Sequence, residues 1–332
     1  MISARKVLKL SKSYSMSLLH PLPLWTHLWV TNRCNLTCDY CYVVDNKSSV
    51  PSTNEVKSWI AHADNLGTAI VAFMGGEPTL RIDLSEIIAS ATERGLISYL
   101  TTNGKLLTTS RLEDLAKAGL DILELSVDGY YRMNHSPKTL GGKEELIEEL
   151  EEIKRKYGMK FKLHQVLTLE TVEETPNLLE LSQNRRIPLS FGMVYHQNGN
   201  GPLKPEEKIK LGEALKQILE KKRDGLPIIN PLRYFQDMLF SLEHPYRINC
   251  DVGKYMIQVS TNGKIYVCSK LGEESDIKFL DIDKDYFRLD KHRSKELLER
   301  CSHKCLSACA YTTNYFREKP LSFIVNQRSF LW

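Results

Sequence analysis

The sequence predicts an α/β protein made of an open, partial (β/α)6 TIM-like barrel followed by a small cysteine-rich unit. Six strand-like segments alternate with helical ones from about residue 25 to about residue 223, and this order gives parallel strands joined by right-handed crossovers. Six units fall short of the eight that close a full barrel. After about residue 231 the apolar periodicity ends, and five of the eight cysteines follow. We therefore expect a basic N-terminal arm over residues 1–24, the barrel over 25–230 and the small unit over 231–332.

The predicted barrel strands are short apolar or β-branched segments bounded by turn residues. They cover residues 25–31, 69–74, 97–102, 122–127, 161–167 and 189–194. The first three helices are expected to begin at short polar residues, which accept hydrogen bonds from the free N–H groups of a helix start. The candidates are Ser52 for the first helix, Asp83 or Ser85 for the second, and Thr109 or Ser110 for the third. Later helices are expected over residues 143–157, 174–184 and 205–223.

The C-terminal unit is predicted to combine helices with a β-hairpin. A helix is expected over residues 232–241, and two short strands, 256–260 and 264–268, flank Asn262-Gly263. An Asn-Gly pair is a strong hairpin signal, because both central residues of the tight turn have positive φ. We expect this hairpin to be organised around the neighbouring cysteines.

The composition excludes several classes of protein. With 45 Lys+Arg against 41 Asp+Glu the formal net charge is +4, too small and too evenly spread to indicate a nucleic-acid partner. No run of 18 apolar residues exists, so no membrane span is predicted. The first 38 residues contain no acidic residue, but His20 and Pro21 interrupt the candidate signal-peptide core. We interpret this start as a short strand or arm packed on the barrel. We expect a cytoplasmic protein, in which cysteines serve as metal ligands or catalytic thiols.

Three cysteines follow the first strand within eight residues: Cys34, Cys38 and Cys41. Thiolates at this spacing can bind one metal site if the loop wraps around it. A zinc ion would need a fourth protein ligand, and the closest downstream histidine is His62, on a predicted helix. A [4Fe–4S] cluster would instead keep one iron open. The spacing alone is compatible with both.

The spacing Cys-x3-Cys-x2-Cys, with Tyr40 before the last cysteine, resembles the signature of the radical S-adenosylmethionine (SAM) enzymes. Supporting motifs follow the next three strands, at the rim where the carboxyl ends of parallel strands meet. They are Gly75-Gly76-Glu77-Pro78, Thr102-Asn103-Gly104 and Ser126-Val127-Asp128-Gly129. The combination is far more specific than any one motif.

The resemblance implies a [4Fe–4S] cluster on the three cysteines whose free iron is chelated by SAM. An electron from a flavodoxin- or ferredoxin-type donor would then split SAM into methionine and a 5′-deoxyadenosyl radical. It also implies that Gly75 to Pro78 approaches the methionine amino group, where glycines permit close backbone approach. The other residues implied at the cofactor are Asn103, Tyr40 near the adenine, Ser126 and Asp128 at the ribose, and Leu167 and Met193 along the adenine. For the last four a packing role is the alternative.

The C-terminal cysteines resemble the SPASM or twitch extension of many radical SAM enzymes. Cys250, twelve residues, Gly263, four residues and Cys268 match the opening of that pattern, and Cys301, Cys305 and Cys309 follow. A zinc ribbon would require Cys-x2-Cys pairs on both sides, and none occurs. Five thiols suggest one auxiliary [4Fe–4S] cluster and one spare cysteine, for which Cys309 is the candidate. The spare thiol either packs in the core or donates a hydrogen atom to a substrate radical.

The predicted function is hydrogen abstraction from an unactivated C–H bond of a small metabolite or peptide, with the auxiliary cluster assisting by electron transfer or substrate binding. One alternative is a ribosomal-peptide maturase, an epimerase or crosslinking enzyme, that uses the spare cysteine. An alternative of another class is a non-catalytic iron–sulfur redox sensor.

Overall fold

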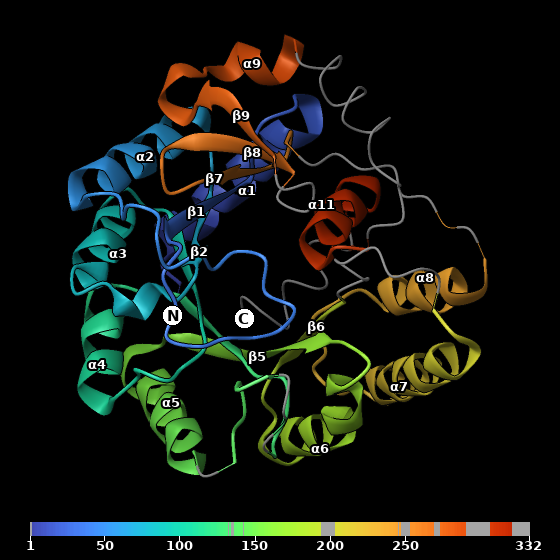
Figure 1. Cartoon of the computed structure of the whole chain (residues 1–332). Coiled ribbons are helices and arrows are strands. Elements are labelled where there is room, and N and C mark those ends of the chain that lie inside the picture. Colours follow the sequence, from blue (N-terminus) through green and yellow to red (C-terminus); the bar gives the residue numbers. More distant parts are fainter. Residues whose placement is uncertain are drawn as a thin grey trace.

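The computed structural model describes the chain from residue 2 to residue 320 with several gaps. The described residues are 2–131, 133, 136–141, 143–193, 203–244, 246, 253–268, 273–289 and 306–320. Their strands form one nine-stranded sheet in the order β6-β5-β4-β3-β2-β1-β7-β8-β9. Figure 1 shows this sheet curving around a central space, with helices on its outer side.

The six barrel strands are parallel and follow one another in sheet order. They are β1 (Trp25–Thr31), β2 (Ile70–Gly75), β3 (Ile97–Thr102), β4 (Ile122–Ser126), β5 (Lys160–Leu167) and β6 (Leu189–Met193). Each begins and ends within one residue of the predicted bounds. The predicted α/β fold, a partial six-stranded barrel, is therefore confirmed.

The connecting helices cover the convex face of the sheet (Figure 1). They are α2 (Thr53–Leu66), α3 (Leu84–Glu93), α4 (Thr109–Lys117), α5 (Glu144–Tyr157), α6 (Thr175–Arg185), α7 (Pro205–Arg223) and α8 (Leu232–Glu243), with short 3₁₀ turns at Pro78–Leu80, Thr171–Glu174 and Phe279–Asp281. Ser52 caps α2 in a capping box with Glu55, as predicted. The cap of α4 is Thr108, so the expected Thr109 or Ser110 is wrong by at least one residue. Asp83 precedes α3 without capping it, because its carboxylate binds Arg81 instead, at 2.6 Å.

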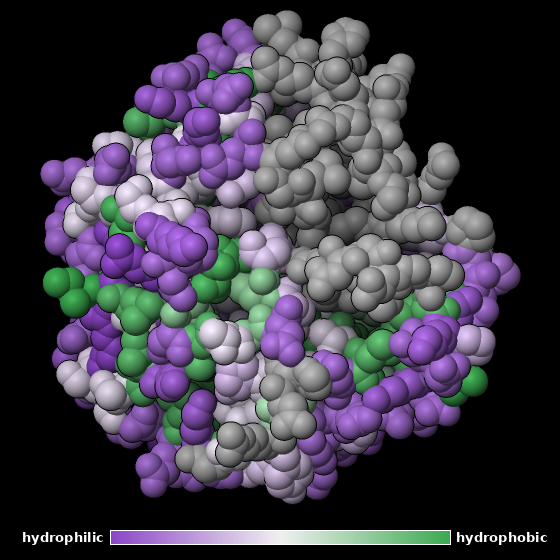
Figure 2. All heavy atoms as spheres, viewed as in Figure 1, coloured by the Kyte–Doolittle hydropathy of each residue, from purple (hydrophilic) through white to green (hydrophobic). Residues whose placement is uncertain are grey.

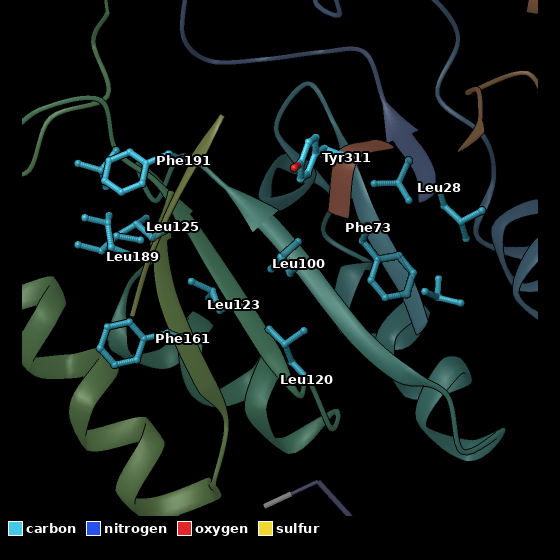
Figure 3. Packing of buried hydrophobic residues seen from close by; sticks show 14 of the residues in the cluster. Leu28, Phe73, Leu100, Leu120, Leu123, Leu125, Phe161, Leu189, Phe191 and Tyr311 are labelled. Carbon is cyan, nitrogen blue, oxygen red and sulfur yellow. The ribbon is translucent and has the colours of Figure 1, made fainter. Parts of the chain in front are cut away.

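Strand alternation divides the side chains between a core and a barrel interior. Leu100, Leu123 and Phe161, on three successive strands, point outward into the apolar core beneath the helices, as Figure 3 shows. The residues on the other face of each strand point into the barrel. The lowest layer of the interior is apolar, with Ile70 and Ile122 among its members.

The N-terminal segment forms a helix, α1 (Ala4–Leu19), rather than the expected strand or arm, although it packs on the barrel as expected. Leu10 joins the apolar layer at the amino ends of the strands. Lys6 forms a buried ion pair with Asp121, the residue before β4, at 2.6 Å, and Lys9 pairs with Asp64. The basic side chains of this acid-free helix thus form ion pairs with acidic residues that are distant in the sequence.

The C-terminal strands extend the barrel sheet beyond β1. They are β7 (Met256–Val259), parallel to β1, and the antiparallel strands β8 (Lys264–Cys268) and β9 (Glu273–Lys278). The predicted hairpin between β7 and β8 is present, but Gly263 alone of its Asn-Gly pair has positive φ, +76°. Its amide donates to Ser260 O, so the loop spans four residues rather than a two-residue turn.

Among residues 273–289 and 306–320, the structure describes the helices α9 (Lys284–Leu289) and α11 (Ala308–Glu318). Asp237 of α8 accepts hydrogen bonds from Tyr246 and from Tyr311 of α11, each at 2.6 Å. Tyr234 of α8 donates to the carbonyl of Leu306. These contacts dock α11 against the barrel near β6. Within the described segments, no helix has the length and apolar character needed to cross a membrane.

Candidate cofactor site

The loop after β1, residues 32–51, carries the three clustered cysteines at the carboxyl end of the sheet. In Figure 1 this blue segment extends over the space that the strands enclose. Cys34 and Cys38 are half-buried and Cys41 is exposed. The Cys34 amide donates to Asn46 Oδ1 at 2.8 Å, and the Cys41 amide donates to the Cys38 carbonyl at 3.0 Å. The loop is therefore folded on itself around the thiols.

Burial shapes the chemistry of two of these thiols. It raises the pKa of Cys34 above its usual value. It also raises the pKa of Cys38, against which the charge of Lys138 acts in the opposite direction. Positive charge and hydrogen-bond donors near a thiol favour its thiolate, which is the form that binds metals. Asn103 supplies such a donor, because its Nδ2 lies 3.8 Å from Cys34 Sγ.

Gly75 and Gly76, at the end of β2, touch the start of the cysteine loop. The Gly76 amide donates to the Thr31 carbonyl at 2.7 Å. A Cβ on Gly75 would lie 2.1 Å from that oxygen, and one on Gly76 would lie 2.2 Å from the Arg33 oxygen. Gly75 also has a φ of +129°. The glycines are thus required for close backbone approach, as the sequence predicted, but the described neighbour is the cysteine loop itself.

Glu77 joins the second and third predicted motifs. Its side chain is 1% exposed. One carboxylate oxygen accepts from Thr79 N at 2.9 Å, Thr79 Oγ1 at 2.5 Å and Thr102 Oγ1 at 2.7 Å, and the other accepts from Asn103 N at 2.7 Å. Asn103 in turn donates from Nδ2 to Asn35 Oδ1, inside the cysteine loop, at 2.9 Å. The cysteine loop, the glycine motif and the Asn-Gly motif therefore form one connected site.

Tyr40 and Asp128 come together at the same rim. The Tyr40 hydroxyl donates to the Asp128 carboxylate, which also accepts from Ser136 Oγ at 2.5 Å and from Val166 N at 3.1 Å. Lys138 completes the group, 3.2 Å from Asp128 and 5.0 Å from the centre of the Tyr40 ring. Burial and the adjacent Asp128 charge raise the pKa of Tyr40, which remains a neutral donor.

This geometry agrees with a known sequence family. The Radical SAM superfamily matches residues 29–182, which run from β1 into α6 and include every motif described above. The segment from residue 29 to residue 182 is a radical SAM domain by this match.

Several curated relatives of this chain are named as synthases or cyclases. It is 29% identical over 216 residues to an Fe-coproporphyrin III synthase of Methanosarcina barkeri, covering 61% of this chain and 52% of that one. It is 28% identical over 274 residues to a probable GTP 3′,8-cyclase of Sulfurisphaera tokodaii, covering 79% and 86%. It is 30% identical over 186 residues to a PqqA peptide cyclase of Bradyrhizobium diazoefficiens, covering 52% and 47%. The chain thus spans about half the length of two of these relatives.

Solved structures share the fold. The structure of SuiB from Streptococcus suis superposes with a TM-score of 0.63 at 18% identity, covering 85% of this chain and 70% of that one. A structure of anSMEcpe with bound AdoMet superposes with a TM-score of 0.62 at 19% identity, covering 92% and 99%. The partial barrel and its C-terminal strands are thus an established arrangement.

The donor set fits a [4Fe–4S] cluster better than a single zinc ion. Among the described residues, no group of three or more His, Cys, Asp or Glu side chains is arranged to hold one metal ion. His62, the possible fourth zinc ligand, contacts the Ile282 carbonyl at 2.9 Å and stacks edge-on against Phe279. Thiolates of a [4Fe–4S] cluster each bind a different iron, so they need not converge on one point. Two buried polar atoms of the loop, Asn32 Oδ1 and Asn35 Nδ2, lack partners.

The remaining predicted cofactor residues lie in different environments. Ser126 is half-buried at the upper end of the barrel interior. Asp128 is fully buried, and chain atoms occupy both of its oxygens. Leu167 and Met193 belong to the outward-facing apolar core. For these last three the environment favours the packing or structural role that the sequence left open.

Sequence reasoning missed several residues of the site. Ser136 and Lys138 lie in the segment after β4 and carry no recognisable motif, and Arg81 reaches the carbonyls of Val30 and Pro51 at both ends of the cysteine loop. Of these, Arg81 alone offered a signal, because it lies three residues after the glycine motif.

The predicted auxiliary site falls largely beyond what the structure describes. Cys250, Cys301 and Cys305 lie outside the described residues, and Cys268 and Cys309 are described as backbone positions of β8 and α11.

Proposed function

We propose that this chain is an enzyme that cleaves SAM reductively and abstracts a hydrogen atom from an unactivated C–H bond of a small metabolite or peptide. The observation that carries the proposal is the connection of three motifs at one rim. Glu77 hydrogen-bonds to Asn103, and Asn103 hydrogen-bonds to the loop of Cys34, Cys38 and Cys41.

Each motif of the site has a defined role in the proposed reaction. Cys34, Cys38 and Cys41 would hold a [4Fe–4S] cluster, which when bound supplies the electron that splits SAM into methionine and a 5′-deoxyadenosyl radical. Asn103 donates toward Cys34 Sγ, and hydrogen bonds to ligand sulfurs raise the potential of such a centre. Gly75 and Gly76 lack side chains, and the backbone from Gly75 to Pro78 would approach the methionine part of SAM.

The chain also anchors the loop from its other side. Asp128 accepts from the Tyr40 hydroxyl, so the aromatic ring next to Cys41 is fixed relative to β4. This fixed ring is the surface that we propose for the adenine of SAM. SAM itself is the bound ligand in structures of SuiB and anSMEcpe that share the fold.

We base the proposed substrate class on the names of the relatives. PqqA peptide cyclases and SuiB, which was solved with the precursor peptide SuiA, favour a peptide. The synthases of iron coproporphyrin and heme favour a small molecule. A peptide maturase, an epimerase or crosslinking enzyme, is the second candidate. We further propose a cytoplasmic enzyme that receives electrons from a flavodoxin or ferredoxin.

We propose one SPASM- or twitch-type auxiliary [4Fe–4S] cluster in the C-terminal unit, residues 231–332. Its ligands would come from Cys250, Cys268, Cys301, Cys305 and Cys309, with one thiol left over and Cys309 as the candidate hydrogen donor. Alanine substitutions of the last three, one at a time, should leave one variant with the full iron content. Loss of the auxiliary cluster in all three would contradict the spare thiol.

The decisive experiment is anaerobic reconstitution with iron and sulfide, followed by dithionite and SAM. We expect 5′-deoxyadenosine, detected by mass spectrometry, in the wild type and in the control Thr37→Ala, which changes an exposed residue between the first two cysteines. Cys34→Ser, Cys38→Ser and Cys41→Ser should each abolish it. A protein that holds a full cluster complement yet forms no 5′-deoxyadenosine would support the redox-sensor alternative instead.

A further inference from the structure

The barrel interior contains a buried polar cluster below the cofactor site. Glu124 of β4 accepts from Tyr99 of β3 and pairs with Lys162 of β5, each contact being 2.6 Å to the same oxygen. Thr101 donates to its other oxygen at 3.2 Å. Burial alone would raise the pKa of Glu124, but the Lys162 charge holds it well below its usual range. Glu124 and Lys162 therefore form a permanent ion pair inside the barrel.

The ion pair lies next to His164, which is two residues after Lys162 on the same face of β5. The His164 Nδ1 atom lies 2.9 Å from Ser190 Oγ of β6. That hydroxyl accepts from Lys162 Nζ at 3.0 Å and donates its single proton to the Leu163 carbonyl at 3.2 Å. With the proton directed to that carbonyl, Oγ turns a lone pair toward Nδ1, and we assign Nδ1 as the donor.

The charge of Glu124 reinforces this tautomer. Its carboxylate lies 3.9 Å from His164 Nδ1, and a negative charge there stabilises a proton on that nitrogen. The proton of the neutral imidazole is thus placed on Nδ1. Nε2 consequently carries a free lone pair.

The Nε2 edge of the ring lies beside Gly192 of β6, which carries no side chain. The His164 side chain is 19% exposed, against 12% for Glu124 and 8% for Lys162. A Cβ at position 192 would lie 3.2 Å from Nε2, so Gly192 leaves space beside that atom. Among the described residues none hydrogen-bonds to Nε2. The cluster therefore presents one unsatisfied acceptor to the interior.

Two further polar atoms without hydrogen-bond partners lie across the same interior. His27 of β1 and Gln258 of β7 occupy paired positions in adjacent parallel strands, so their side chains share the inner face. Both residues are more than nine-tenths buried, and His27 Nδ1 and Gln258 Oε1 have no partner. In Figure 1, β1 and β7 stand opposite β5 and β6 across the central space. Unsatisfied atoms on two sides of one interior are partners that a polar ligand or ordered water can satisfy.

We propose that His164 Nε2 accepts a hydrogen bond from a hydroxyl or amide N–H of the substrate, with Ser190 as the residue that positions the ring. The inference rests on the proposed function, because it takes the barrel interior to be the substrate chamber. It names the substrate class as one with a hydrogen-bond donor at the bound position. A carboxylate or phosphate, which offers acceptors alone, would meet the lone pair unfavourably.

The neutral state of His164 persists in weakly acidic solution. Burial lowers its pKa, and the charges of Lys162 and Lys138 act in the same direction, while Glu124 and Asp128 oppose them. An ordinary imidazole titrates near pH 6.5. The Nε2 lone pair is therefore available across neutral pH.

Nitrogen NMR of the reconstituted full chain, labelled with 15N-histidine, tests the tautomer. We expect the His164 signal, assigned by its loss in His164→Gln, to show a protonated Nδ1 and an unprotonated Nε2 at about pH 7. Ser190→Ala should remove this fixed preference, whereas Ser182→Ala, which changes a buried serine outside the interior, should keep it. A proton on Nε2 in the wild type would overturn the proposal.

Two matched probes test the ligand class on the same sample. N-methylacetamide carries an amide N–H, and N,N-dimethylacetamide does not. We expect the former to shift the Nε2 resonance and to slow carbethoxylation of His164 by diethylpyrocarbonate, and the latter to do neither. Equal effects of the two probes, or no effect of either, would overturn the acceptor role. Since 5′-deoxyadenosine formation tests the proposed function separately, failure of one is distinguishable from failure of the other.

Discussion

Replacement of Glu77 by Gln should loosen the connection between the glycine motif and the Asn103 segment. The wild-type carboxylate accepts four hydrogen bonds, three on one oxygen and one on the other. An amide has one accepting oxygen, so its NH2 group must face at least one donor. The least costly orientation keeps the three bonds to Thr79 and Thr102 and turns the NH2 group toward the Asn103 amide.

The cost can be worked out from these contacts. One hydrogen bond to a charged group contributes about 1.5–3 kcal/mol, and the abandoned N–H of Asn103 remains desolvated. The retained bonds also lose the assistance of the charge. We therefore expect the local opening free energy to fall by about 2–4 kcal/mol, which corresponds to roughly 30-fold or more in exchange rate.

Native-state hydrogen exchange with mass spectrometry measures this directly. The Asn103 amide should lose the most protection in Glu77→Gln, the Thr79 amide should lose less because it keeps its acceptor, and the barrel strands should keep theirs. Glu86→Gln is the matched control, because Glu86 pairs with Lys57 on the surface with 59% of its side chain exposed. Such pairs contribute about 0–1 kcal/mol. Wild-type protection of the Asn103 amide in Glu77→Gln would refute this account of the motif.

Three further perturbations have definite expected outcomes. Lys6→Met removes one partner of the buried pair with Asp121, which should cost about 3–5 kcal/mol and lower the melting temperature measured by calorimetry. Gly76→Ala forces a backbone shift at the start of the cysteine loop, and iron uptake on reconstitution should fall. Burial lowers the pKa of His27 to about 4, below the unfolded value near 6.5, so the unfolded chain binds the proton first as pH falls. Stability should drop by about 3 kcal/mol between pH 6.5 and pH 4 from this group, and His27→Gln should remove that part in urea titrations.

Each of these has a control that isolates its cause. Lys12→Met alters an exposed lysine of the same helix and should leave the melting temperature nearly unchanged. Gly225→Ala carries the strain of a φ of +93° without any contact within 4 Å, so it should not affect iron uptake. Iron uptake by Gly76→Ala at the wild-type level would contradict the close-approach argument. An unchanged pH dependence in His27→Gln would contradict the assignment to that histidine.

The barrel strands were predictable because each buries its outward side chains beneath a helix. Segments such as β3 and β6 are short, apolar and bounded by turn residues, so local patterning defines them almost to the residue. The cysteine and glycine motifs were predictable for a related reason. Their chemistry requires particular residue types at fixed spacing along the chain, and parallel strands bring their carboxyl ends to one rim.

Other features depend on partners that are distant in the sequence. The basic start of the chain is a helix that Lys6 anchors to the barrel by pairing with Asp121, 115 residues later. Asp128, predicted as a ribose contact, is buried among Tyr40, Ser136 and Lys138. No local pattern encodes such a network, since Tyr40 lies 88 residues before Asp128.

The sequence by itself determined the order of the six barrel strands and the rim on which the cysteine, glycine and Asn-Gly motifs lie, because periodicity and motif position are local properties of the chain. The tertiary structure decided which polar groups satisfy one another. It paired Glu77 with Asn103, and it placed His164 beside Ser190 so that one nitrogen stays free. The physical reason is that a buried polar atom must find its partner in space, and the folded sheet alone determines which distant residues are within reach.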